Sequence, residues 1–163
     1  MPAETDQEDS PAEAELDELV LLLPQILRAI RRDIGGVSLP EGLRPLFLDT
    51  PLGPRHIPAL VFLYHDGPMG VGELAGRLGV GLTAASQMVG DLDRVGLVER
   101  RQDEADRRRT IVDIAAAARS EVARWVETRE RPMRRTLAEL PPPERMAFLK
   151  GLRILRRELS DWG

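Results

Sequence analysis

One stretch of the chain, residues 71–114, constrains the fold more than any other. Its apolar residues recur at positions i, i+3, i+4 and i+7, which is the spacing of one helix face. This spacing occurs first in VGELAGRL and again between Ala85 and Leu92. The residues that follow are strand-like and are interrupted by a charged turn. We therefore predict two short helices, joined by a glycine turn and followed by a two-stranded hairpin.

Glycines mark the ends of these elements. Gly79 and Gly81 flank Val80, so the chain can turn there, and we expect Val80 to fill the core between the two helices. Gly96 stands where a left-handed residue commonly ends a helix. The hairpin is predicted to pair Leu97–Arg101 with Thr110–Ile114.

The second helix carries a polar stripe opposite its apolar face, and the hairpin tip is rich in arginine. A braced helix of this kind can enter the major groove of DNA, while the hairpin, or wing, offers cations beside it. The residues expected to contact base edges are Thr83, Ser86 and Gln87, with Leu82 against a thymine methyl group. The expected phosphate or wing contacts are Arg77, Arg94, Arg107, Arg108 and Arg109. Asp106 is expected to orient a neighbouring guanidinium.

These residues resemble a known family. The segments GELAGRLGV, DLDRVGLVERR and DEADRRR are similar to the winged helix-turn-helix of the multiple antibiotic resistance regulator (MarR) family, and the resemblance covers roughly Arg55 to Arg119. It implies a dimeric transcriptional regulator, usually a repressor, that often releases DNA when a small molecule binds. By position alone, it implies an effector pocket near His56, Leu60 and Tyr64.

The chain departs from the family pattern at three places. Gly81 replaces a hydroxyl residue before the recognition helix, so the helix cap is weaker. Gln87 replaces a cation and can hydrogen-bond an adenine without supplying charge. Residues 115–118, all alanine, replace a threonine-containing start of the helix after the wing. These departures bear on which operator is preferred, and much less on whether DNA is bound.

We predict a mainly α fold with a small β-hairpin wing, in which a winged helix-turn-helix is joined to a helical dimerisation body. The predicted divisions are an acidic disordered tail (1–12), an N-terminal helical dimerisation segment and loop (13–54), the DNA-binding lobe (55–114) and C-terminal helices of the dimerisation body (115–163). Pro24 and Pro132 are expected to kink or break their helices.

Two apolar stripes lie outside the lobe. One consists of Leu16, Leu19, Val20, Leu23, Leu27, Ile30 and Ile34, and the other of Phe148, Leu149, Leu152, Leu155 and Leu159. These stripes are too apolar for lone surface helices, so they form either a core within the chain or an interface with a second copy. We favour the interface, because neither helix has a sheet to cover and symmetric homodimers are common.

The net charge of −4 conceals a basic body. Eight acidic residues and no Lys or Arg occur through Glu18, and subtracting them leaves 23 basic against 27 − 8 = 19 acidic residues, a charge of +4. The acidic tail is either a solvated disordered segment or an arm that competes with DNA for the wing; we favour the former.

Composition argues against several other classes. The chain has no cysteine, which excludes disulfides and thiolate metal sites. There is no Gly-rich phosphate loop, and the two histidines, His56 and His65, lack metal-ligand spacing on a helix, so we expect no enzyme, metal or cofactor. No secretory signal or membrane span is seen, which favours the cytoplasm. The alternative function is a winged-helix module that binds another protein instead of an operator.

Overall fold

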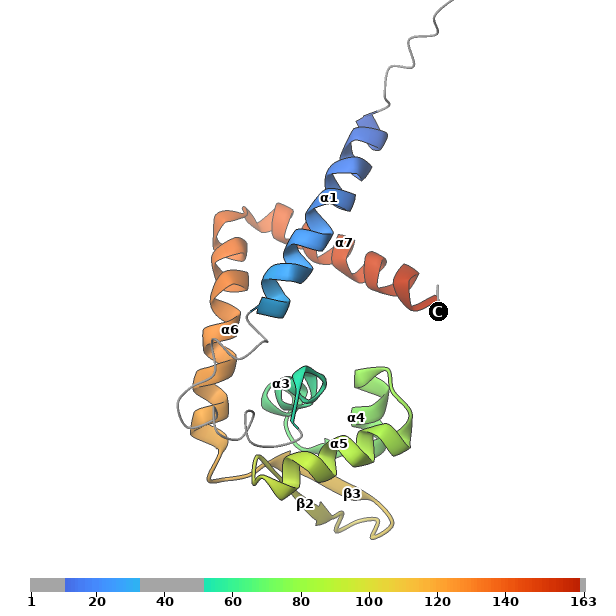
Figure 1. Cartoon of the computed structure of the whole chain (residues 1–163), viewed down its shortest axis with the longest axis vertical. Helices are drawn as coiled ribbons and strands as arrows, with labels where there is room; N and C mark the ends of the chain where they lie inside the picture. Colours follow the sequence, from blue (N-terminus) through green and yellow to red (C-terminus); the bar gives the residue numbers. More distant parts are fainter. Residues whose placement is uncertain (1–10, 33–51, 162–163) are drawn as a thin grey trace, which may run out of the picture.

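A computed structural model of the chain describes residues 11–32 and 52–161, and these form six α-helices, one short 3-10 helix and three strands (Figure 1). In chain order they are α1 (Pro11–Arg32), η2 (Pro54–His56), α3 (Ile57–Asp66), β1 (Met69–Gly70), α4 (Val71–Leu78), α5 (Leu82–Arg94), β2 (Val98–Gln102), β3 (Thr110–Ile114), α6 (Arg119–Glu139) and α7 (Pro142–Asp161). The prediction of a mainly α fold with a hairpin wing is confirmed.

The sheet has three strands in the order β1-β3-β2, and both pairs are antiparallel. The hairpin pairs Val98 with Ile114 at its base and Gln102 with Thr110 toward its tip. Strand β1 adds a third edge, with Met69 opposite Val112. The sequence prediction missed β1, because a two-residue strand shows no alternation.

The lobe has one hydrophobic core, to which α3, α4, α5, all three strands and the first half of α6 contribute. Its largest fully buried side chain is Trp125 of α6, packed in one cluster with Leu60 and Leu63 of α3 and Leu92 of α5. Helix α6 therefore belongs partly to the lobe, which extends beyond the predicted boundary at residue 114.

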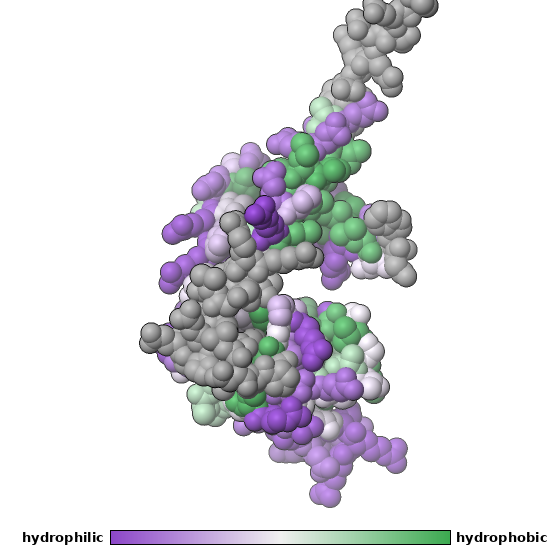
Figure 2. Space-filling model, in the orientation of Figure 1, coloured by the Kyte–Doolittle hydropathy of each residue, from purple (hydrophilic) through white to green (hydrophobic). Residues whose placement is uncertain are grey.

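Helices α1 and α7 extend away from this lobe and bury little within the chain (Figure 1). Figure 2 shows apolar side chains gathered over both helices, whereas the wing surface is hydrophilic. The large apolar side chains exposed there are Leu16, Leu19, Val20, Leu21, Leu22, Ile26, Leu27 and Ile30 on α1, and Met146, Phe148, Leu152, Ile154 and Leu159 on α7. The described part of the chain thus leaves both predicted stripes largely uncovered.

Several local predictions are confirmed and others are wrong. Gly79 and Gly96 have φ values of +68° and +75°, as expected for left-handed helix ends. Val80, however, is 38% exposed, because its backbone N–H closes the turn onto Ala75 O (3.1 Å) and its side chain stays at the surface.

The two prolines predicted to kink or break their helices do not break them. Pro24 lies inside an uninterrupted α1, and Pro132 inside an uninterrupted α6. A proline removes a single backbone donor, and a long helix can continue past it. Ile34, the loop predicted between the first helix and residue 52, and the tail up to residue 10 lie outside the described residues. Over the described ranges, no helix combines the length and apolarity needed to cross a membrane.

Candidate nucleic-acid interface

Helix α5 presents a polar face because its apolar residues are all used in the core. Ala85, Met88, Val89 and Leu92 are buried, as the helical spacing requires. Thr83, Ser86, Gln87 and Arg94 are exposed on the other side, and Leu82 is 59% exposed at the first turn. Helix α4 packs against α5 through buried Leu74 and Ala75 and fixes its angle. The residues predicted to read bases therefore share one exposed surface.

The wing is stiffened at its tip by two aspartates. Asp103 accepts a hydrogen bond from the backbone N–H of Ala105 (2.9 Å), and Asp106 accepts one from that of Arg108 (3.0 Å). Arg109 N–H also donates to Asp106 O (2.9 Å). Asp106 thus orders the turn through the backbone, whereas the sequence predicted that it orients a guanidinium.

Three wing arginines are exposed and available for ligands. Among the described residues, no carboxylate lies within ion-pair distance of Arg107, Arg108 or Arg109. By contrast, Arg77 pairs with Asp66 (2.7 Å) and Arg94 pairs with Asp91 (2.8 Å). Unlike Arg77 and Arg94, these three wing cations can bind an anion without first giving up a partner.

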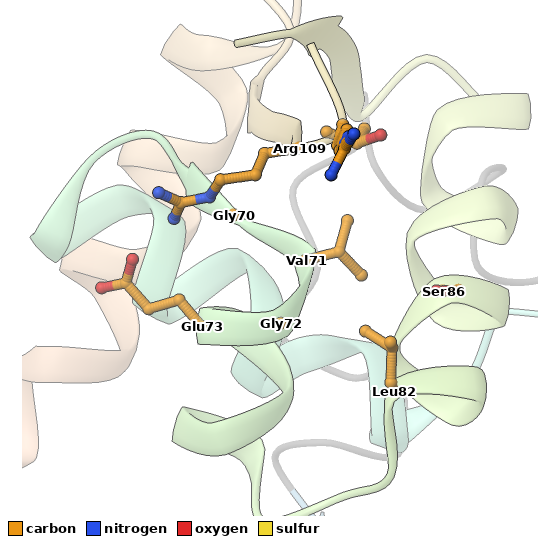
Figure 3. Close-up of a pocket in the computed structure, with 9 residues that line it drawn as sticks. Gly70, Val71, Gly72, Glu73, Leu82, Ser86 and Arg109 are labelled. Atoms are coloured by element: carbon orange, nitrogen blue, oxygen red, sulfur yellow. The ribbon is translucent and has the colours of Figure 1, made fainter. Parts of the chain in front are cut away.

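A cleft of about 360 Å³ separates the wing from the start of α5 (Figure 3). Leu82 and Ser86 line one side, and Arg108 and Arg109 line the other. The Arg109 guanidinium lies against the backbone of Gly70, where a Cβ atom would come within 3.2 Å of Nη2. The fold therefore brings the wing cations and the residues predicted to read bases to one surface.

The predicted effector residues do not line this cleft. His56 and Leu60 are fully buried, and Leu60 belongs to the core. Tyr64 is partly buried against the same core, with its ring edge-on to His65 at 5.1 Å between centroids. The expectation that these three residues form an effector pocket is therefore not supported for His56 and Leu60, which pack inside the lobe.

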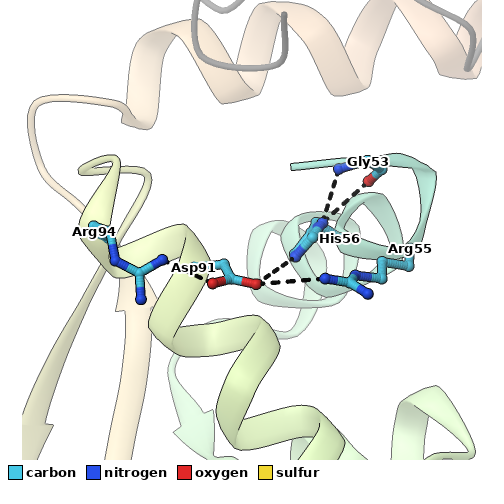
Figure 4. Close-up of polar contacts among 5 residues, drawn as sticks. All are labelled: Gly53, Arg55, His56, Asp91 and Arg94. Carbon is cyan, nitrogen blue, oxygen red and sulfur yellow. Dashed lines mark hydrogen bonds and ion pairs between the residues drawn. The ribbon is translucent and has the colours of Figure 1, made fainter. Parts of the chain in front are cut away.

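His56 belongs instead to a polar cluster at the other side of α5 (Figure 4). The Gly53 N–H donates to His56 Nδ1 (2.9 Å), which leaves Nε2 to donate to Asp91 Oδ2 (3.3 Å). Asp91 also pairs with Arg94 (2.8 Å) and with Arg55 (3.6 Å). The hydrogen bond from Arg94 is the main cause that lowers the pKa of Asp91, and it outweighs the burial that raises this pKa.

Sequence reasoning missed Arg55 and Asp91. Asp91 stands four residues after Gln87, which places it beside the polar stripe, but its partners Arg55 and His56 lie far back in the chain. Only the packing of α3 near α5 brings them together.

Asp91→Asn is expected to destabilise the protein at neutral pH and to have no effect in strong acid. A carboxyl group whose pKa is lower in the folded state stabilises the fold above its unfolded pKa, about 3.9, and loses this effect as the pH falls through the folded value. Urea unfolding of both proteins at pH 7 and in acid measures this. Arg94→Gln should reproduce most of the loss at pH 7, since Arg94 is the main cause of the shift. An equal difference between wild type and Asp91→Asn at both pH values would contradict the assignment.

Comparisons with known proteins agree with this geometry. A family model described as the MarR family matches residues 50–109. The uncharacterized HTH-type transcriptional regulator YfiV of Bacillus subtilis (strain 168) is 29% identical over 102 residues, which are 63% of this chain and 64% of that protein. The matched stretch thus spans slightly less than two thirds of this relative.

Solved structures show the same fold. FabT of Streptococcus pneumoniae, in complex with DNA, superposes with a TM-score of 0.69 at 17% identity, over 91% of this chain and 99% of that one. The crystal structure of MarR has a TM-score of 0.55 at 25% identity, over 88% and 98%. The matched family model and these structures thus show that the winged-helix lobe, with the exposed polar face of α5, is similar to that of MarR family transcriptional regulators.

Proposed function

We propose that the protein binds a pseudo-palindromic operator as a homodimer and represses transcription until a small molecule releases it. The observation that carries this proposal is the exposed polar face of α5 beside three wing arginines that have no carboxylate partner among the described residues. Such a surface matches the major groove with its flanking phosphates. The need to reach chromosomal DNA favours the cytoplasm, and we propose no catalytic role.

Each exposed side chain then has a proposed task. Thr83, Ser86 and Gln87 contact base edges, and Leu82 contacts a thymine methyl group. Arg107, Arg108 and Arg109 contact phosphates or the adjacent minor groove, and their different directions allow one or two of them to do so at once. Arg77 and Arg94 can also reach phosphates, but each must share its guanidinium with the carboxylate that already holds it.

The exposed apolar faces of α1 and α7 support the homodimer. Leu19 and Ile30 on α1 and Phe148 and Leu152 on α7 are all more than 40% exposed within one chain. Apolar faces of this extent are typical of interfaces between subunits. A twofold axis would place the two α5 helices in successive major grooves, about 34 Å apart.

Ligand release is the part of the proposal that rests on family resemblance. The proposed effector site lies between the dimer body and the lobe, and in the described structure the side chains of His56 and Leu60 are buried inside the lobe. Operator affinity measured with and without small-molecule candidates tests this step separately from DNA binding.

Gln87→Ala is expected to weaken the preference for one base pair of the operator while most of the binding affinity remains. A glutamine that bonds an adenine contributes about 1–3 kcal/mol of discrimination at that position. Selection of bound duplexes from a random pool, performed with wild type and variant, measures the change. Thr128→Ala, at an exposed position of α6, serves as the control for a change outside the proposed DNA-contacting surface. Identical base preferences for wild type and Gln87→Ala would refute this readout.

A further inference from the structure

The two sides of the α5 face are bordered by different elements. Residues two positions apart on a helix point about 200° away from each other, so Asp91 and Asp93 lie on opposite flanks of α5. Asp93 faces the wing, where it pairs with Arg100 of β2 (2.8 Å). Asp91 faces the start of α3, where it pairs with Arg55 of η2 (3.6 Å). The polar face of α5 therefore runs between the wing on one side and Arg55 on the other.

The Asp91 flank has an excess of positive charge. Asp91 holds two guanidinium groups, of Arg55 and Arg94, whose side chains are 68% and 66% exposed. The carboxylate itself is only 18% exposed, and fully buried His56 lies behind it (Figure 4). One carboxylate between two arginines leaves a net positive charge that faces solvent. Each guanidinium has further N–H groups to donate.

A helix in the major groove has a phosphate backbone on either side of it, because the groove is bounded by both strands. The wing arginines can contact the phosphates of one of these strands. We propose that Arg55, held beside Arg94 by Asp91, binds a phosphate of the other strand. Arg55 is then a phosphate contact, and Asp91 is a positioning residue that sets the direction of both guanidinium groups. This inference rests on the DNA binding proposed above.

Arg55→Gln tests the phosphate contact. We expect the affinity for a pool-selected duplex to fall about threefold to tenfold, and the slope of log affinity against log salt to fall by about 0.9, the value for one phosphate. Arg124→Gln is the matched control, since Arg124 is also ion-paired and 66% exposed but lies on α6. It removes the same charge and should leave the slope unchanged. Equal slopes and affinities for wild type and Arg55→Gln would overturn the proposal.

A duplex with one neutral methylphosphonate identifies the strand. Placed at the phosphate that Arg55 contacts, this group should weaken wild-type binding but add nothing to the defect of Arg55→Gln. The same scan with Arg108→Ala identifies the phosphates at which the methylphosphonate adds nothing to the defect of that variant. The phosphate assigned to Arg55 should lie across the major groove from these. If the methylphosphonate adds nothing to either variant's defect at the same segment of one strand, the assignment of Arg55 to the second strand is wrong.

Asp91→Asn separates positioning from charge by the sign of its effect. A carboxylate that only repels DNA would, when neutralised, give tighter binding. A carboxylate that holds Arg55 and Arg94 would give weaker binding, although the protein becomes more positive. We expect Asp91→Asn to bind DNA more weakly, with the folded fraction verified by thermal unfolding. Unchanged or tighter binding would overturn the positioning role.

Failure of this inference can be told apart from failure of the proposed function. If the wild-type protein shows no salt-dependent duplex binding, the proposed function fails. If the wild-type protein binds and these variants behave like it, only this inference fails.

Discussion

Replacement of Arg107, Arg108 and Arg109 together by alanine is expected to weaken operator binding about tenfold to a hundredfold. A charge-assisted hydrogen bond contributes about 1.5 kcal/mol or more, and about 1.4 kcal/mol corresponds to a tenfold change. One or two of the three are expected to contact DNA at once, so the slope of log affinity against log salt should fall by about 1 to 2. Fluorescence anisotropy at several salt concentrations measures both quantities.

The control for this variant removes three exposed arginines from α6. Arg124, Arg131 and Arg135 are all exposed there, and their replacement by alanine changes the net charge equally. A long-range charge effect would weaken both triple variants alike, whereas direct contacts weaken only the wing variant. Equal losses in the two variants would show that the wing makes no contact with DNA.

Leu152→Glu is expected to convert the proposed homodimer to monomers and to weaken operator binding by about 10²–10⁴-fold, the gain that linking two binding modules supplies. Leu152 is 48% exposed within one chain, so a charge there should leave the monomer folded. In a dimer interface the same charge would lose its hydration without a partner. Light scattering gives the mass, and circular dichroism verifies the fold.

Leu152→Met is the matched variant, because it keeps an apolar side chain of similar volume at the same place. It should remain dimeric with wild-type affinity. If Leu152→Glu stays dimeric and binds the operator normally, the exposed face of α7 is not the dimer interface, and the reading of that face as an intersubunit surface is wrong.

The recognition helix could be predicted from sequence because its information is local. The spacing of Ala85, Met88, Val89 and Leu92 fixes which side is buried, and the opposite side follows from helix geometry. The ends of the helices could also be predicted from the sequence, since Gly79 and Gly96 take the left-handed conformation that glycine permits. The strand Thr110–Ile114 was predicted with its observed bounds.

Other features depend on contacts between distant segments and were missed. Strand β1 exists only because β3 offers Met69 and Gly70 an edge to pair with. The bond between His56 and Asp91 joins residues 35 positions apart, and no periodicity links them. The prolines of α1 and α6 do not break their helices, because the loss of one donor does not end a helix with many other hydrogen bonds.

Operator recognition is tested most directly by the binding of the purified 163-residue chain to a duplex selected from a random pool, titrated over a range of salt concentrations. We expect one dimer per site and an affinity that falls linearly with salt on logarithmic axes, with a slope of about 0.9 per phosphate contacted. A folded and dimeric protein that binds no duplex at low ionic strength would contradict this expectation.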